Sequence, residues 1–102
     1  MSDVELRYFD SCPHWQLADS RLQEAIAQEG FDAEITYTKV QTAEDADRLD
    51  FIGSPSIVIK GVDVWRPRGA EPGLACRMYA TDDGPQGSPT VKQLRAALTD
   101  LL

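Results

Sequence analysis

The fold is decided by the stretch Tyr8-Phe9-Asp10-Ser11-Cys12-Pro13-His14-Trp15. Strand-forming residues alternate over positions 4–9, which predicts a half-buried strand. From Trp15 onward, apolar side chains recur three or four positions apart, which predicts a helix over residues 13–29 with a core-facing stripe of Trp15, Ala18, Leu22, Ala25 and Ile26. Cys12 therefore lies where a strand gives way to a helix.

This position gives Cys12 a chemical interpretation. Pro13 suits the first helical position because its missing N–H would have no partner there. The free N–H groups and the positive dipole end of the helix favour a thiolate over a thiol. Cys12, with His14 beside it, is therefore a candidate nucleophile or soft-metal ligand, and the alternative is a buried, inert cysteine.

Length and composition indicate one globular domain over residues 1–102. The chain is 42% hydrophobic and 26% charged, which is ordinary for a folded domain. Its net charge of −7 argues against nucleic acid as a partner. The first 50 residues hold 12 acids and 4 bases, whereas the rest holds 5 and 6. Either the acids form a solvated face, or Arg66, Arg68 and Arg77 receive an anionic ligand.

Several features predict a cytoplasmic protein without a membrane partner. No apolar stretch approaches the roughly 20 residues of a membrane span. The acidic N-terminus enters a strand directly and does not resemble a secretory signal. Two cysteines 64 positions apart do not make a secreted disulfide framework, so they indicate transient redox chemistry, metal binding or a structural role.

The middle of the chain predicts three more strands and a short helix. Alternation over residues 31–38 favours a strand, and Thr42 followed by acids favours a capped helix ending near Leu49. Residues 56–60 and 62–65 read as antiparallel strands that turn at Gly61.

Residues 66–88 form a loop-rich insertion before the last helix. Positions 66–89 hold four Gly and four Pro, and a connection of this length usually has a function. Within it, residues 74–79 favour a short extra strand, and residues 82–84 favour a turn. Ser88 is the expected cap of the final helix, with Pro89 in its first turn and a buried stripe of Val91, Leu94, Leu98 and Leu101.

The order strand, helix, strand, helix, strand, strand, helix, with Cys12 at the first helix and Gly53-Ser54-Pro55 before the third strand, resembles the thioredoxin-like superfamily. The resemblance covers nearly the whole chain apart from the insertion. It implies an α/β three-layer sandwich, in which helices flank a mixed sheet of about four strands. It also implies a cis Pro55 facing Cys12, which would leave the Ser54 carbonyl free to pair with an extended thiol ligand. The alternative is a trans proline that opens an edge strand.

The chain departs from that family at the position of the second cysteine. Thioredoxins carry Cys-x-x-Cys, but here Trp15 takes the resolving position, so we expect Trp15 to pack against the core or cover the thiol. The chain is also similar to small bacterial thioredoxin-like proteins that are sometimes labelled alkylmercury lyase-like. The matching residues are Cys12, Pro13 and Trp15; Gly53, Ser54 and Pro55; and Cys76, Arg77 and Tyr79.

The first functional hypothesis is a thiol–disulfide oxidoreductase without a cofactor. Cys12 would attack as a thiolate, and Cys76 would resolve the mixed disulfide if the insertion folds over the first helix. If Cys76 is instead a remote or buried strand cysteine, Cys12 would act alone with a small thiol such as glutathione or with a protein thiol. The expected substrate-binding residues are Pro13, His14, Trp15, Ser54, Pro55 and Arg77.

Two other hypotheses remain open. Cys12 and Cys76 could capture a soft metal or organometal, with Met78 or His14 as a further ligand and Asp10, Asp82 or Asp83 as a proton donor. The chain has no four-ligand zinc pattern, so no metal site is assigned. Alternatively, the domain is a redox-inactive binding module, in which Trp15 and Trp65 serve a protein partner if they are exposed near Cys12.

Overall fold

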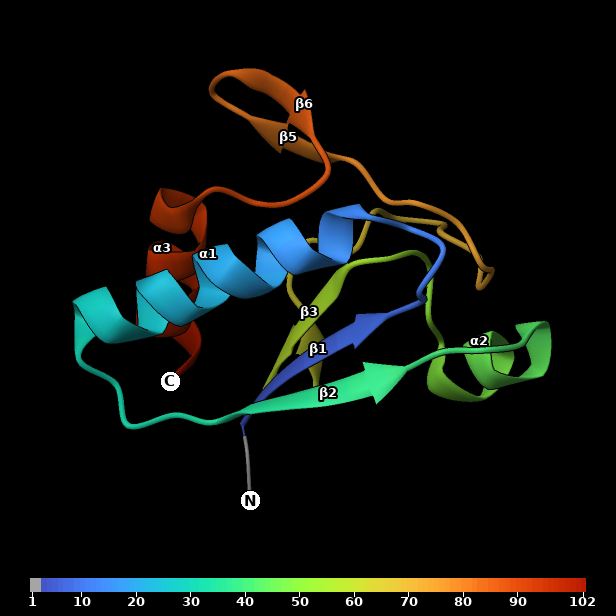
Figure 1. Cartoon of the computed structure of the whole chain (residues 1–102), viewed down its shortest axis with the longest axis horizontal. Helices are drawn as coiled ribbons and strands as arrows, with labels where there is room; N and C mark the ends of the chain where they lie inside the picture. The colour runs from blue at the N-terminus through green and yellow to red at the C-terminus, as the bar shows by residue number, and fades with distance from the viewer. Residues whose placement is uncertain (1–2) are drawn as a thin grey trace.

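The central sheet has four strands in the order β2 (Ile35–Lys39), β1 (Val4–Tyr8), β3 (Ser56–Ile59) and β4 (Val62–Asp63) (Figure 1). β1 runs parallel to β2 and antiparallel to β3, and β3 runs antiparallel to β4. The computed structural model describes residues 3–102, so Met1 and Ser2 of the predicted domain lie outside the described residues. The predicted mixed sheet of about four strands is confirmed.

Helices α1 (His14–Glu29) and α3 (Val91–Leu101) cover one face of this sheet and contact each other. The main core lies between them and the sheet and includes Leu6, Leu22, Ile57 and Leu98. Helix α2 (Ala43–Leu49) lies beyond the end of β2 (Figure 1) and packs around a second, smaller core with Phe51. The helical layer is therefore built by α1 and α3, while α2 sits at the end of the sheet, so the structure is a mixed α/β fold and the predicted three-layer arrangement is not confirmed.

The predicted ends of two helices are confirmed, and the predicted cap of a third is wrong. Thr42 caps α2 by accepting a hydrogen bond from the Asp45 N–H at 3.1 Å, and Gly30 ends α1 with a φ of 71°. The predicted Ser88 cap of α3 is wrong. Thr90 caps this helix in a capping box with Gln93, because the buried Ser88 hydroxyl donates instead to the Pro89 carbonyl at 2.7 Å.

Two predicted strands have different bounds. The strand expected over residues 31–38 begins at Ile35, because the Phe31 N–H donates to the Ile26 carbonyl and closes the end of α1. Phe31 then packs against the main core from outside the sheet. The strand expected over residues 62–65 ends at Asp63, and Val64 and Trp65 continue along the main core.

The insertion contains a second, two-stranded sheet that stands above α1 (Figure 1). Strands β5 (Tyr79–Thr81) and β6 (Gly84–Gln86) pair antiparallel across the turn predicted at residues 82–84. Arg21 of α1 binds the C-terminal end of this hairpin. Its guanidinium donates to the Gln86 side chain at 2.9 Å and to the Pro89 carbonyl at 3.1 Å. The insertion is therefore attached to α1.

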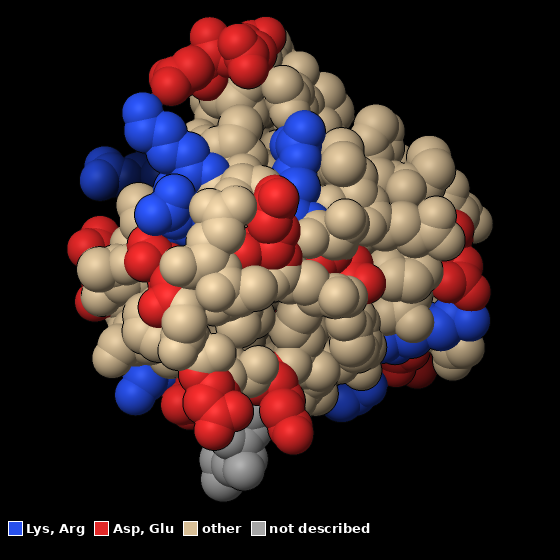
Figure 2. Space-filling view, turned by 60° about the vertical axis from the view of Figure 1, so that its left-hand side comes forward, with Lys and Arg blue, Asp and Glu red and all other residues tan. Residues whose placement is uncertain are grey.

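Charged side chains of both signs are interspersed on the face shown in Figure 2. Arg95 of α3 pairs with Glu29 at the end of α1 at 3.3 Å. Within residues 3–102, no helix has the length and apolar character needed to cross a membrane.

Candidate functional site

The loop between β1 and α1 buries Cys12 completely. Its backbone N–H donates to the Phe9 carbonyl at 3.2 Å, which turns the chain out of β1. Its side chain has 0% exposed area, and the thiol donates to the Ser54 carbonyl at 3.4 Å. Pro13 occupies the N-cap position of α1, one residue before the position predicted for it, so Cys12 lies two residues before the helix begins.

Ser54 joins this loop to the segment before β3. The Ser54–Pro55 peptide bond is cis, as the sequence predicted. The Ser54 side chain is buried, and its hydroxyl oxygen accepts the Phe9 N–H at 3.2 Å. The loop that carries Cys12 and the loop that carries Pro55 are therefore fixed to each other.

The backbone of Ser54 is already paired within the chain. Its N–H donates to the Ala75 carbonyl at 2.8 Å, and its carbonyl accepts the Arg77 N–H at 2.9 Å. These two bonds form a parallel bridge between Ser54 and Cys76. The expectation that the Ser54 carbonyl is free for an extended ligand is wrong, because the insertion itself pairs with it. The short strand predicted over residues 74–79 is therefore reduced to this single bridge at Cys76, and strand β5 begins only at Tyr79.

The bridge brings the two cysteines together. Both are free thiols, Cys12 buried and Cys76 exposed. The pKa of the Cys76 thiol is raised above its usual value, first by a side-chain hydrogen bond with Cys12, then by burial, then by the charge of Cys12. Cys76 is therefore not remote from Cys12, because it pairs with Ser54, whose carbonyl also accepts the Cys12 thiol.

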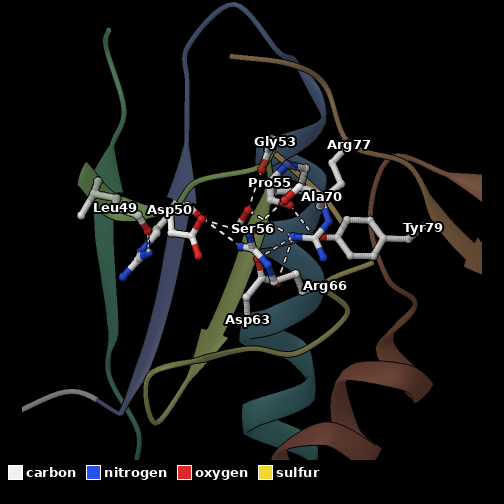
Figure 3. Close-up of polar contacts among 11 residues, drawn as sticks. Leu49, Asp50, Gly53, Pro55, Ser56, Asp63, Arg66, Ala70, Arg77 and Tyr79 are labelled. Carbon is white, nitrogen blue, oxygen red and sulfur yellow. Dashed lines mark hydrogen bonds and ion pairs between the residues drawn. The ribbon is translucent and has the colours of Figure 1, made fainter. Parts of the chain in front are cut away.

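Arg77 fixes the insertion from the inside (Figure 3). Its side chain is 6% exposed, and one guanidinium nitrogen lies 2.9 and 3.0 Å from the two Asp63 carboxylate oxygens and 3.2 Å from the Ser56 hydroxyl. The guanidinium also stands 4.8 Å from the centre of the Tyr79 ring. Arg77 therefore has an internal carboxylate partner, and the structure does not present it to solvent as the expected receiver of an anionic ligand.

Tyr79 and Gly53 complete this attachment. The buried Tyr79 hydroxyl donates to the Pro55 carbonyl, and burial raises the pKa of this hydroxyl above its usual value. A side chain at Gly53 would place its Cβ 3.0 Å from the Arg77 Cβ, so glycine allows the two segments to approach. Asp63 and Ser56 were missed by sequence reasoning. The signal available was an acidic residue between two valines in a predicted strand.

His14 and Trp15, which follow Cys12 in the sequence, pack against other parts of the protein. The His14 imidazole packs against Gly87, so close that a Cβ there would lie 2.0 Å from Nδ1. Trp15 stacks on Tyr8 with ring centres 4.2 Å apart and packs against the main core, as predicted. Trp65 also packs against that core, with its ring edge-on to Tyr79. Neither tryptophan is a freely exposed aromatic.

The residues expected to support metal chemistry are dispersed. Within residues 3–102, no three or more His, Cys, Asp or Glu side chains are grouped to hold a metal ion. Asp10 forms an ion pair with Lys39 at 2.5 Å, and residues 82 and 83 form the hairpin turn. Met78 is 57% exposed on the insertion.

The site is thus a pair of interacting thiols, one buried and one exposed, held together by the backbone of Ser54. Such a pair can form a disulfide or share a thiophilic atom between two sulfurs. Comparison of the chain with protein-family models, with curated proteins and with solved structures returned no match.

Proposed function

We propose that the protein is a thioredoxin-like thiol–disulfide oxidoreductase that alternates between a Cys12/Cys76 dithiol and a Cys12–Cys76 disulfide. The observation that carries the proposal is that Ser54 holds both cysteines, because it pairs with Cys76 in a parallel bridge and its carbonyl accepts the Cys12 thiol at 3.4 Å. Thioredoxins carry a second cysteine at the position that Trp15 occupies here. In this protein Cys76 of the insertion would provide the second sulfur instead. The position of Cys12 before α1 supports the same chemistry, because an N-terminal helix end stabilises a thiolate.

The reaction transfers two electrons. Two protein thiols lose two protons and two electrons and form one sulfur–sulfur bond, while a partner disulfide gains them and becomes two thiols. The partner class is a small disulfide such as glutathione disulfide or an accessible protein disulfide. The net charge of −7 disfavours nucleic acid as a partner, and a cytoplasmic location with no membrane partner stays a prediction.

The test is a redox titration of the intact protein. The wild type is equilibrated in graded glutathione buffers, quenched by alkylation and analysed by peptide mapping. The proposal expects a Cys12–Cys76 disulfide to form within the intracellular range of about −220 to −320 mV. Cys12→Ser and Cys76→Ser, which each remove one sulfur, are the matched controls and must lose the bridged peptide. Two free thiols at every potential would refute the proposal.

A second candidate, binding of a soft cation, is favoured by the same contact. Two thiolates suit a cation that accepts two-coordinate sulfur ligation, such as Cu(I) or Hg(II). Titration of the reduced protein with Hg(II) distinguishes metal binding from thiol–disulfide exchange. A one-to-one complex that needs both sulfurs, in a protein that never forms the disulfide, would favour metal capture. A redox-inactive binding module predicts instead that Cys12→Ser leaves partner binding intact.

A further inference from the structure

The two sulfurs differ in what can reach them. Cys12 has no exposed area, and its sulfur lies against the Ser54 carbonyl. Cys76 is exposed. Thiol–disulfide exchange requires the incoming sulfur to contact the sulfur it attacks, so access decides which thiol meets an outside partner. In this conformation an outside partner reaches only Cys76.

The cover over Cys12 is firmly attached. Two backbone hydrogen bonds join Ser54 to the residues on either side of Cys76. Side chains then alternate along the insertion: Arg77 and Tyr79 point inward to Asp63 and to the Pro55 carbonyl, whereas Cys76 and Met78 are exposed. Moving the segment that carries Cys76 away from Ser54 would require both backbone bonds to separate. Cys76 can exchange without any of these contacts breaking.

We propose that Cys76 is the sulfur that exchanges with the outside partner, and that buried Cys12 is the resolving thiol and the leaving group. This assignment rests on the proposed function. It reverses the roles that the sequence resemblance implies, in which the cysteine before the first helix attacks.

The steps balance with a partner disulfide, RSSR. The Cys76 thiol loses its proton to water, and its thiolate attacks one sulfur of RSSR, which gives Cys76–S–S–R and RS⁻ while Cys12 remains a thiol. The departing RS⁻ takes the Cys12 proton, and the Cys12 thiolate then attacks the Cys76 sulfur, which forms Cys12–S–S–Cys76 and releases a second RS⁻. In the reverse direction, an outside thiolate attacks the Cys76 sulfur and expels the Cys12 thiolate, which lies just before the N-terminus of α1.

The environment of Cys76 makes this deprotonation the step that depends on pH. The pKa of the Cys76 thiol is raised, first by a side-chain hydrogen bond with Cys12, then by burial and by the charge of Cys12. The thiol must therefore lose its proton before it attacks, and its reaction rate should rise with pH.

The test uses glutathione disulfide as the probe and intact mass as the readout. Reduced Cys12→Ser is expected to accumulate one glutathione at Cys76. Reduced Cys76→Ser is expected to react at least about tenfold more slowly than reduced Cys12→Ser, because its remaining thiol is buried. Unfolding Cys76→Ser in urea should make Cys12 react, which shows that the thiol was covered rather than damaged.

The wild type provides a second measurement that does not depend on the folding of a variant. Rapid acid quenching during oxidation should trap the transient adduct on Cys76, and its decay should match the appearance of the Cys12–Cys76 disulfide. An adduct that maps to Cys12, in a wild type that still forms the disulfide, would overturn the role assignment alone. A wild type that forms no disulfide would overturn both this assignment and the proposed function.

Discussion

The start and the middle of the insertion differ in how an arginine attaches each of them. Arg66 reaches Asp50 at 3.0 Å, but the Asp50 side chain is 66% exposed. Arg77 reaches Asp63 at 2.9 Å, and the two side chains are only 6% and 15% exposed. Water screens the first pair and not the second, although both look alike in the sequence. The difference teaches that burial decides which part of the insertion is fixed, and the fixed part carries Cys76.

The comparison also explains why Cys76 is held over Cys12. The buried arginine follows Cys76 directly, and its backbone N–H forms one of the two bonds to Ser54. One residue therefore supplies both a backbone bond and an internal ion pair. The position of the exposed thiol is set by the interior of the protein.

The largest expected effect comes from Arg77→Met. The substitution leaves Asp63, whose side chain is 15% exposed, without a cationic partner, and breaking a largely buried pair in this way costs about 3–5 kcal/mol. We expect the free energy of unfolding, measured in urea, to fall by this amount. The matched variant Arg66→Met removes an exposed pair and should cost less than about 1 kcal/mol.

The double variant Arg77→Met with Asp63→Leu separates charge from shape. It removes both charges, so most of the lost stability should return if an unpaired carboxylate is the cause. Equal losses for Arg77→Met and Arg66→Met would contradict the distinction between the start and the middle of the insertion.

The next effect concerns the contact between the insertion and α1. Gly87→Ala places a Cβ 2.0 Å from the His14 ring, so the imidazole or the chain must move. Overpacking of this kind costs about 1–3 kcal/mol, which thermal unfolding should show as a lower Tm.

Gly73→Ala is the matched control, because nothing lies within 4 Å of a Cβ there and its φ is not in the left-handed region. It should change stability by less than about 1 kcal/mol. Adding His14→Ala to Gly87→Ala should restore part of the loss. No recovery would mean that the ring is not the obstacle.

A smaller effect is expected for Tyr79→Phe. The hydroxyl donates to the Pro55 carbonyl in a buried setting, and removing it leaves that carbonyl unsatisfied at a cost of about 1–2 kcal/mol. Tyr37→Phe removes an exposed hydroxyl that donates to Asp19, and should cost less than about 0.5 kcal/mol. Similar losses for the two variants in urea unfolding would contradict the role of Tyr79 in holding the insertion.

Much of the fold follows from local patterns in the sequence. The helical stripe after Trp15, the cap at Thr42 and the turn at Gly61 each depend on neighbouring residues, so the sequence alone predicts them. The Ser88 cap was wrong for a local reason, because Thr90 offers the same oxygen together with Gln93 three residues later.

The site was harder to predict because its parts are distant in the sequence. Cys12, Ser54 and Cys76 each stood out as candidates, but nothing local specifies that residues 75–77 pair with Ser54. Arg77 was assigned to an outside anion because its partner Asp63 lies 14 positions away in another strand. Long-range pairing of polar groups has no periodic signal in one sequence, unlike the apolar stripe of a helix.

The smallest expected effect tests the contact between the thiols through pH. The Cys76 pKa is raised first by its hydrogen bond with Cys12, then by burial and by the charge of Cys12. Alkylation by iodoacetamide follows the thiolate fraction, so Cys12→Ala should move the midpoint of the Cys76 rate profile to lower pH. Below both midpoints the variant should react faster than the wild type by a constant factor, because a larger fraction of its Cys76 is thiolate. Above both midpoints the two rates should be equal.

Cys12→Ser sharpens this test, because its hydroxyl can accept a hydrogen bond from Cys76 but carries no charge at neutral pH. Its midpoint should fall between those of the wild type and Cys12→Ala. Identical midpoints for all three proteins would mean that the thiols do not touch in solution, and Arg77 would then fix the insertion without presenting Cys76 to Cys12. Midpoints that decrease from the wild type through Cys12→Ser to Cys12→Ala would show that the segment fixed by Arg77 holds Cys76 against Cys12, since Arg77 follows Cys76 directly.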